Sequence, residues 1–535
     1  MRNSRVRTGR RRWLAAAATL AVAMAAPPPS AAAPRGEPAR SLAQLDADFV
    51  AAAADLVRRC RLTGSDEMAA MIETWQLPAA DGRQQAFRIP AVIETPPSVT
   101  TDETRSIWND FLAARRARAE GLFAHAVFAA GRHDLLPTRA DLAKPGADQA
   151  VPLAQRSCEA IRLVYLALRD DPTHARAREA AGWVQRGDRW EWPEVARRLD
   201  QGEAFDPLLG WMPKGRLARI RDDRRPPDNP SRRDGTTAPV TDLRRAPQFA
   251  SDHWEIVSTA EPAATAELAV LLEATRLVWL QVFGGFAVEP DDLERQLAGR
   301  GRRRPHLPHS AILCGSRDQY VTELQRLEPR IGISDGLYWQ PTRTIWCYAA
   351  PALPARDTVW HEATHQLFAE SRPDIMRMRA EPGRRCGFWA VEAAALYAES
   401  VAEAPFGWTL GGRDRGRCPA AREQLMADDF YLPLADLAAL GREAFQADER
   451  LAQLYDQCGG LADFFMNASA GRYREAFVEY LVRVYSGTAA PDTLFRLCGR
   501  SGPELDTEYR AFITAATTSR LEPMPRTAEQ PEAGP

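Results

Sequence analysis

The sequence has no marked excess of either charge, almost no lysine and no Cys-x-x-Cys pair. Its 69 basic and 71 acidic residues leave a formal net charge of -2. No overall field therefore favours nucleic acid or an anionic membrane, and we expect no nucleic-acid partner. Lys144 and Lys214 are the only lysines. Because no cysteines have the Cys-x-x-Cys spacing, the sequence does not predict a zinc site built from cysteine.

Long apolar runs are also missing, apart from one near the N-terminus. Residues 13–26 are apolar over 14 positions, fewer than the roughly 20 that a membrane-spanning helix needs. Six arginines precede this run, and prolines and small residues follow it, which is typical of a removable secretory signal. We therefore expect a signal peptide over 1–33, an exported (periplasmic or extracellular) chain and no membrane span in the mature chain. An uncleaved anchor is the alternative.

The chain has eight cysteines, and an even number in an exported protein suggests that they form disulfides. Eight cysteines allow about 105 pairings. We expect neighbours in the sequence to pair, and buried free thiols are the alternative for each pair. The expected disulfides are Cys60–Cys158, Cys314–Cys347, Cys386–Cys418 and Cys458–Cys498.

The first half of the chain has mainly helical periodicity. Apolar residues at three- and four-residue spacing predict helices over 42–61, 104–132, 155–169 and 174–185. Four tryptophans then crowd a short segment and predict a small aromatic core; they are Trp183, Trp190, Trp192 and Trp211. We expect a helical N-terminal region over 41–212 that ends in this Trp-rich segment.

The second half begins after a segment rich in charge and proline. Residues 213–249 contain few apolar side chains, which predicts a linker. The pattern then predicts strands over 253–258, 309–314 and 336–347, a helix over 263–283, and mainly helices over 356–517. The tail over 521–535 is expected to be disordered. The expected fold class is α+β and mainly helical.

The strongest chemical motif is His361-Glu362-Ala363-Thr364-His365. Positions four apart share one helix face, so both imidazoles can point at one ion. Zinc binds neutral imidazole, and a catalytic zinc has three protein ligands and an open water position. Glu362 projects to the side, where it can reach a water at the metal. The alternative is an exposed polar helix that carries two histidines.

A third ligand is expected from a later helix. The metzincin pattern fails, because Ser371 stands where its third histidine would be and Phe368 where its glycine would be. Glu392 is instead a lone carboxylate inside an apolar run. A buried, unpaired carboxylate is costly and needs a cation or hydrogen bonds, so Glu392 is the predicted ligand. A half-exposed glutamate is the alternative. Glu399 is either a partner that orients a ligand imidazole or a solvated charge.

These residues resemble a known group of enzymes. The motif around His361 and His365, followed by Trp389-x-x-Glu392-x-x-Ala395-x-Tyr397-x-Glu399, is similar to the gluzincin metallopeptidases. More closely, residues 253–517 resemble exported bacterial peptidase-MA-like proteins. The resemblance implies a zincin-like catalytic domain, placed at 250–520, with a small sheet before the active-site helix. It also implies a peptide or protein substrate. The family usually has glycine after the ligand glutamate, where this chain has Ala393.

The motif predicts metal-assisted hydrolysis with Zn2+, in which Glu362 acts as general base. Candidate donors for the oxyanion are Tyr455, Tyr473 and Tyr480 in the C-terminal helices. A second interpretation is a non-catalytic helical scaffold that binds a protein partner, with a structural or absent zinc. A third is a zinc hydrolase that acts on substrates other than peptides. The sequence leaves these alternatives, the substrate and the oligomeric state open.

Overall fold

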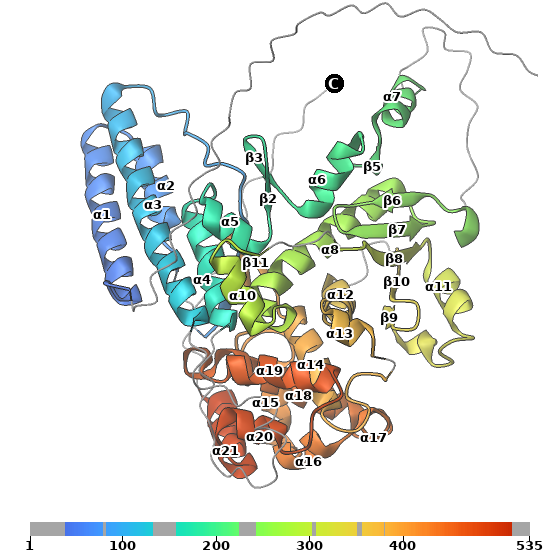
Figure 1. Ribbon diagram of the computed structural model, residues 1–535. Helices are drawn as coiled ribbons and strands as arrows, with labels where there is room; N and C mark the ends of the chain where they lie inside the picture. The colour runs from blue at the N-terminus through green and yellow to red at the C-terminus, as the bar shows by residue number, and fades with distance from the viewer. Residues whose placement is uncertain are drawn as a thin grey trace, which may run out of the picture. The chain divides into compact units, whose positions relative to one another are not determined.

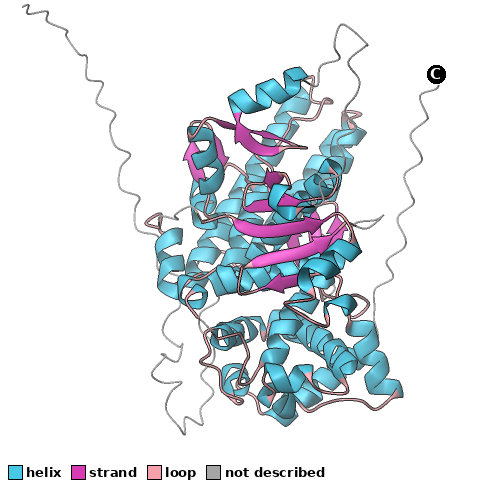
Figure 2. Ribbon diagram, turned by 90° about the vertical axis from the view of Figure 1, so that its right-hand side faces the viewer, coloured by secondary structure: helices cyan, strands magenta, loops and turns pink. Residues whose placement is uncertain are grey.

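A computed structural model describes residues 38–78, 82–131, 157–223, 242–301, 306–349, 356–378 and 380–515. Helices make up most of this part of the chain and strands form small sheets, as Figure 2 shows. The α+β, mainly helical class is therefore confirmed. No helix in the described ranges is both long and apolar enough to span a membrane. The expected signal peptide and C-terminal tail lie outside the described residues.

The N-terminal helices form wherever the sequence has helical periodicity. They are α1 (Leu42–Leu62), α2 (Asp66–Trp75), α3 (Asp102–Ala130), α4 (Ser157–Asp170) and α5 (Ala175–Ala181). Capping boxes at Ser41 and Thr101 fix the starts of α1 and α3. Helix α3 packs against both α1 and α4 (Figure 1). Its first half buries a cluster shared with α1 and α2, and its second half joins the main core.

The Trp-rich segment does not form one aromatic core. It contains the hairpin β2 (Val184–Arg186) and β3 (Arg189–Glu191), α6 (Pro193–Asp200), and the hairpin β4 (Glu203–Asp206) and β5 (Gly210–Pro213). Trp183 stacks on Trp192 with ring centroids 4.1 Å apart. Trp211 instead packs against Phe205 and donates to Asp252 Oδ1 over 2.7 Å. Trp183 and Trp192 therefore pack together, while Trp211 has different neighbours.

The range expected as a linker contains regular structure at both ends. Helix α7 (Lys214–Asp223) follows β5 directly, and the 3-10 helix η1 (Leu243–Arg245) precedes β6 (Gln248–Ala250). Residues 224–241 lie outside the described residues. Gly210 lies so close to β6 that an added Cβ would be 2.5 Å from the Ala250 carbonyl oxygen. The hairpin β4–β5 therefore contacts the strand that opens the larger sheet.

The larger sheet precedes the motif helix in the sequence. Its strands β7 (Trp254–Ser258), β8 (His309–Cys314), β9 (Leu337–Trp339) and β10 (Thr344–Tyr348) join β6 in the order β6-β7-β8-β10-β9. Strands β7, β8 and β10 are parallel, and β6 and β9 are antiparallel edges. The connections carry α8 (Pro262–Val282), α9 (Gly284–Ala287), α10 (Pro290–Leu297), α11 (Arg317–Leu324) and the 3-10 helix η2 (Ile331–Ile333). The expected strand 309–314 is confirmed residue for residue.

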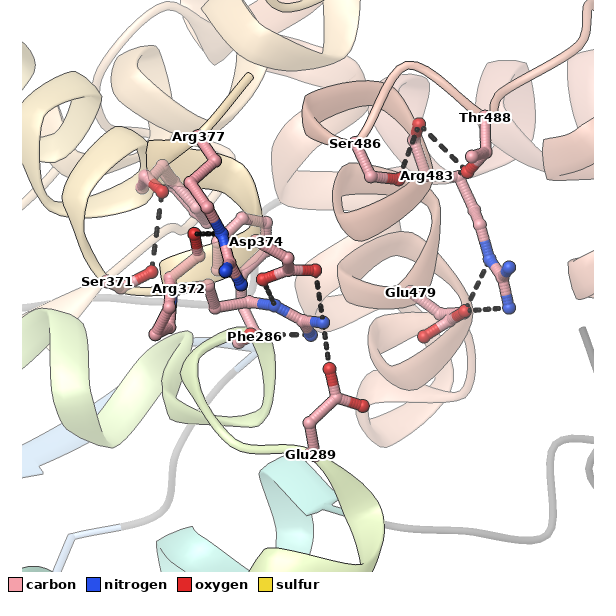
Figure 3. Close-up of polar contacts among 12 residues, drawn as sticks. Phe286, Glu289, Ser371, Arg372, Asp374, Arg377, Glu479, Arg483, Ser486 and Thr488 are labelled. Carbon is pink, nitrogen blue, oxygen red and sulfur yellow. Dashed lines mark hydrogen bonds and ion pairs between the residues drawn. The ribbon is translucent and has the colours of Figure 1, made fainter.

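The motif lies on α12 (Arg356–Glu370), which packs against α8 and α14 (Phe388–Glu399). The short α13 (Pro373–Met376) follows α12. Figure 3 shows how Arg372 anchors this junction: its guanidinium contacts the Phe286 carbonyl, Glu289 and Asp374. Arg372 is buried, so these contacts fix the end of the motif helix against the connection between α9 and α10.

The rest of the chain is helical, apart from one small sheet. The helices are α15 (Cys418–Ala427), α16 (Leu434–Ala439), α17 (Arg442–Gln446), α18 (Leu451–Gly471), α19 (Arg474–Tyr485), α20 (Thr493–Cys498) and α21 (Gly502–Thr514). Strands β11 (Ala402–Ala404) and β12 (Gly407–Leu410) pair with each other, and β12 also pairs with β1 (Gln84–Phe87). This sheet joins segments more than 300 residues apart, and the local pattern did not predict it.

All eight cysteines are described and unpaired, so none of the four expected disulfides is formed. Strand register explains one case, because Cys314 is opposite Tyr348 and Cys347 is opposite Leu313. Successive side chains on a strand point to opposite faces, and the two thiols therefore lie in different buried clusters. Similarly, Cys60 and Cys158 lie in separate clusters.

Candidate metal centre

The structure brings the three predicted ligands together. Helix α12 presents His361 and His365 one turn apart, and their Nε2 atoms are 3.1 Å from each other. Helix α14 presents Glu392, whose Oε2 is 3.6 Å from His361 Nε2 and 3.8 Å from His365 Nε2. One ligand atom from each residue lies within 4.8 Å of the other two.

These separations fit a zinc ion. Nitrogen and oxygen ligands bind zinc at about 2.0–2.2 Å, usually in a tetrahedron, which places neighbouring ligand atoms about 3.4 Å apart. The three observed separations, 3.1, 3.6 and 3.8 Å, lie on both sides of that value. Two imidazoles and one carboxylate also form a donor set typical of catalytic zinc.

The charges of the three side chains are mutually dependent. Burial alone would raise the pKa of Glu392, but the hydrogen bond from His361 and the charges of both imidazoles hold it below its usual value. Burial works against protonation of His361, yet Glu392 and Glu399 raise its pKa to about 10. Burial lowers the pKa of His365 to about 4. His361 therefore favours its protonated form and must lose that proton before it can bind a metal.

Glu399 lies next to a predicted ligand. Its Oε1 is 2.9 Å from His361 Nδ1, the ring nitrogen that faces away from the other ligands. Its Oε2 accepts from Arg417 Nε over 3.4 Å, and Arg417 also donates to Asp456. Carboxylates in this position fix the tautomer and orientation of a ligand imidazole. Of the two interpretations of Glu399, the geometry fits the orienting partner.

Glu362 lies beside the ligands and is held by the sheet. Its Oε2 accepts from the backbone N–H of Tyr338, on edge strand β9, over 2.6 Å. The strand can approach this closely because Gly336 has no side chain. A Cβ added there would be 2.6 Å from Thr358 and 3.2 Å from Glu362. Burial raises the pKa of Glu362, while the charge of His361 opposes this shift. The carboxyl group is thus fixed in place beside the ligand set.

Of the three tyrosines expected as donors, only Tyr455 is a neighbour of the ligands. Burial and the nearby Glu392 carboxylate raise the pKa of Tyr455. Tyr473 instead donates to Glu508 over 2.6 Å. Tyr480 is buried, and its ring packs near that of Trp389.

Sequence reasoning missed several neighbours of the site. The Tyr338 N–H is a backbone donor and leaves no trace in the sequence. Arg442, on α17, lies close enough for its charge to act on both His365 and Glu392. The charge of Glu392 likewise acts on Tyr485, on α19. Arg442 and Tyr485 come from elements distant in sequence from α12, so no spacing rule could have found them.

His253 and His309, both buried, each lie beside a carboxylate of their own. His253 Nδ1 is 2.6 Å from Glu273 Oε2, and its Nε2 is 3.6 Å from Glu194. His309 Nδ1 is 2.8 Å from Glu370 Oε2, whose other oxygen accepts from the Tyr338 hydroxyl. Each of these rings therefore has its Nδ1 paired with one carboxylate inside the protein.

The chain matches no family model, no curated protein and no solved structure.

Proposed function

We propose that this protein is a zinc-dependent hydrolase of the gluzincin type, with a zincin-like domain and peptide bonds as its substrate. His361, His365 and Glu392 would hold the metal. The observation that carries this proposal is the convergence of these side chains from two helices, with Glu362 fixed beside them. Peptide as the substrate rests on the resemblance of the motifs around α12 and α14. Export rests on the N-terminal sequence pattern.

The residues of the chain have separate parts in the reaction. When bound, zinc would lower the pKa of a water molecule and polarise the scissile carbonyl. Glu362 would take the proton of the attacking water and later deliver it to the leaving amine. The Tyr338 N–H would keep the Glu362 carboxylate oriented during both transfers. The Tyr455 hydroxyl, already beside Glu392, would donate to the developing oxyanion.

Glu362→Gln tests the general base. We expect kcat to fall by about 10^2- to 10^4-fold, the usual size of general acid–base catalysis, with zinc still bound at one ion per chain. A library of peptides analysed by mass spectrometry, together with metal analysis, gives both readouts. Glu323→Gln, an exposed glutamate on α11, is the control and should keep full activity.

Two outcomes would contradict parts of the proposal. Full activity of Glu362→Gln would refute the role of Glu362. Wild-type protein that binds one zinc through His361 and His365 but cleaves no peptide would favour the structural-zinc interpretation.

A further inference from the structure

A cavity of about 400 Å³ adjoins the proposed metal centre. Ala369 lines it and lies four residues after His365 on α12, so it shares the helix face of the ligands. Tyr338 lines it too, and its N–H holds Glu362. Tyr485 also lines the cavity, and the charge of Glu392 contributes to raising its pKa. The cavity therefore begins one helical turn beyond His365.

Most of the remaining wall is apolar and adaptable. It is formed by Pro341, Ile375, Met376, Met378, Ala380 and Pro382. Methionine side chains are unbranched and fill irregular spaces. The wall can thus accept the hydrocarbon part of a substrate residue without selecting one shape. Selection must come from the polar groups of the cavity.

Two of these polar groups are arginines that lack a carboxylate partner. Arg343 donates Nη2 to the Met376 carbonyl over 2.8 Å, and Arg377 donates Nε to the Pro373 carbonyl over 2.9 Å (Figure 3 shows Arg377). Neither forms an ion pair with a described residue. Glu381, the only acidic side chain among the described residues of the cavity wall, is 3.2 Å from Arg442. The cavity therefore has an excess of positive charge.

The backbone at Arg343 gives an independent indication. Its φ is +54° in the turn that connects β9 and β10. Glycine and asparagine adopt this left-handed conformation more easily than other residues, and hairpin turns favour them there. The turn thus holds an arginine in a conformation that disfavours it. In this position Arg343 lines the cavity, and its guanidinium donates to the carbonyl of Met376 at the end of α13.

We propose that this cavity binds a carboxylate of the substrate, with Arg343 and Arg377 as the binding residues. The carboxylate belongs either to an acidic side chain near the scissile bond or to the C-terminus of the peptide. Guanidinium groups bind carboxylates through paired N–H donors, which gives direction as well as charge. The inference rests on the proposed hydrolase function, since it assigns the charge of the substrate of that site.

The test compares matched peptides on the full-length, zinc-loaded protein. One series replaces Glu by Gln at each position around the cleaved bond, and another compares a free C-terminus with its amide. In one of the two series, we expect kcat/KM to be about tenfold higher for the peptide that has the carboxylate. The series in which this happens shows whether the bound carboxylate is a side chain or the C-terminus. Arg343→Gln and Arg377→Gln should each reduce this ratio severalfold, and Arg343→Lys should restore part of it.

Arg326→Gln removes an exposed arginine that lines none of the described cavities and should leave the ratio unchanged. Equal kcat/KM in both series, or a preference that survives both glutamine variants, would overturn the assignment. If the wild type cleaves no peptide, the binding of fluorescent peptides to Glu362→Gln replaces turnover. Carboxylate-dependent binding that both arginine variants weaken would still support the cavity, although the hydrolase proposal had failed. Charge-independent binding would overturn it.

Discussion

Two pairs of histidines in this protein, one half-buried and one buried, differ in how they share their partners. His361 and His365 face each other at 3.1 Å and have Glu392 in common. His253 and His309 each have a carboxylate of their own within hydrogen-bonding distance. In the second set each ring has a carboxylate of its own at Nδ1, so that nitrogen is not open to an ion. The first set instead turns three ligand atoms toward one point, where a single cation could contact all of them. The convergence of the donor atoms, and not burial, therefore separates the candidate metal centre from the two single pairs.

The largest expected effect is on the amount of bound zinc, which should differ between substitutions in the two sets. His365→Ala should reduce bound zinc from about one ion per chain to near zero, because two ligands hold zinc poorly. His309→Ala should keep the zinc but lower the free energy of unfolding by about 2 kcal/mol, because the buried Glu370 loses a partner. Metal analysis and urea unfolding measure both quantities. Zinc loss from His309→Ala, or zinc kept by His365→Ala, would remove the distinction.

A smaller effect is expected from the carboxylate that orients His361. Glu399→Gln should weaken zinc binding by about 10- to 100-fold, the usual consequence of losing a hydrogen-bonded partner of a metal ligand. Competition with a chelating dye measures the dissociation constant. Glu403→Gln is the matched control, since Glu403 is exposed and ion-pairs with Arg356 away from the ligands. Unchanged affinity in Glu399→Gln would show that Glu399 does not support the site.

The smallest expected effect is the loss of folding stability in acid that comes from the carboxylates beside His253. Burial alone would raise the pKa values of Glu194 and Glu273, but the hydrogen bonds and charge of His253 lower both to about 2. Because these pKa values are lower in the folded state, their contribution to stability is complete above pH 4.5 and is lost towards pH 2. We expect the free energy of unfolding to fall by on the order of 1 kcal/mol per pH unit for each carboxylate.

Urea unfolding between pH 5 and 3 measures this slope, and Glu273→Gln should make it shallower. An identical slope in wild type and Glu273→Gln would contradict the assignment of this carboxylate. Glu323→Gln, on the exposed face of α11, serves as the control that keeps the wild-type slope.

The residues of the proposed ligand set could be selected from the sequence because each stands out in its own local pattern. Helical periodicity places His361 and His365 on one face without any tertiary information. Glu392 was conspicuous as a single carboxylate in an apolar helix, and the structure buries it as expected. The long helices α1, α3, α4 and α8 and the strands β7 to β10 were also predicted, since each shows its own period, whereas α7 and most of β6 lie in the range expected as a linker. The disulfide prediction failed, because cysteine spacing carries no information about which face of a strand a thiol occupies.

The sequence by itself determined that this chain is mainly helical and that two imidazoles point the same way from one helix. Only the tertiary structure decided that Glu392 meets them, that a backbone N–H of β9 holds Glu362, that Tyr455 is the tyrosine beside the ligands, and that β1 pairs with β12. The physical reason is the range of the interactions. Helix geometry repeats every few residues, whereas the convergence of side chains from separate elements depends on how their buried faces pack together.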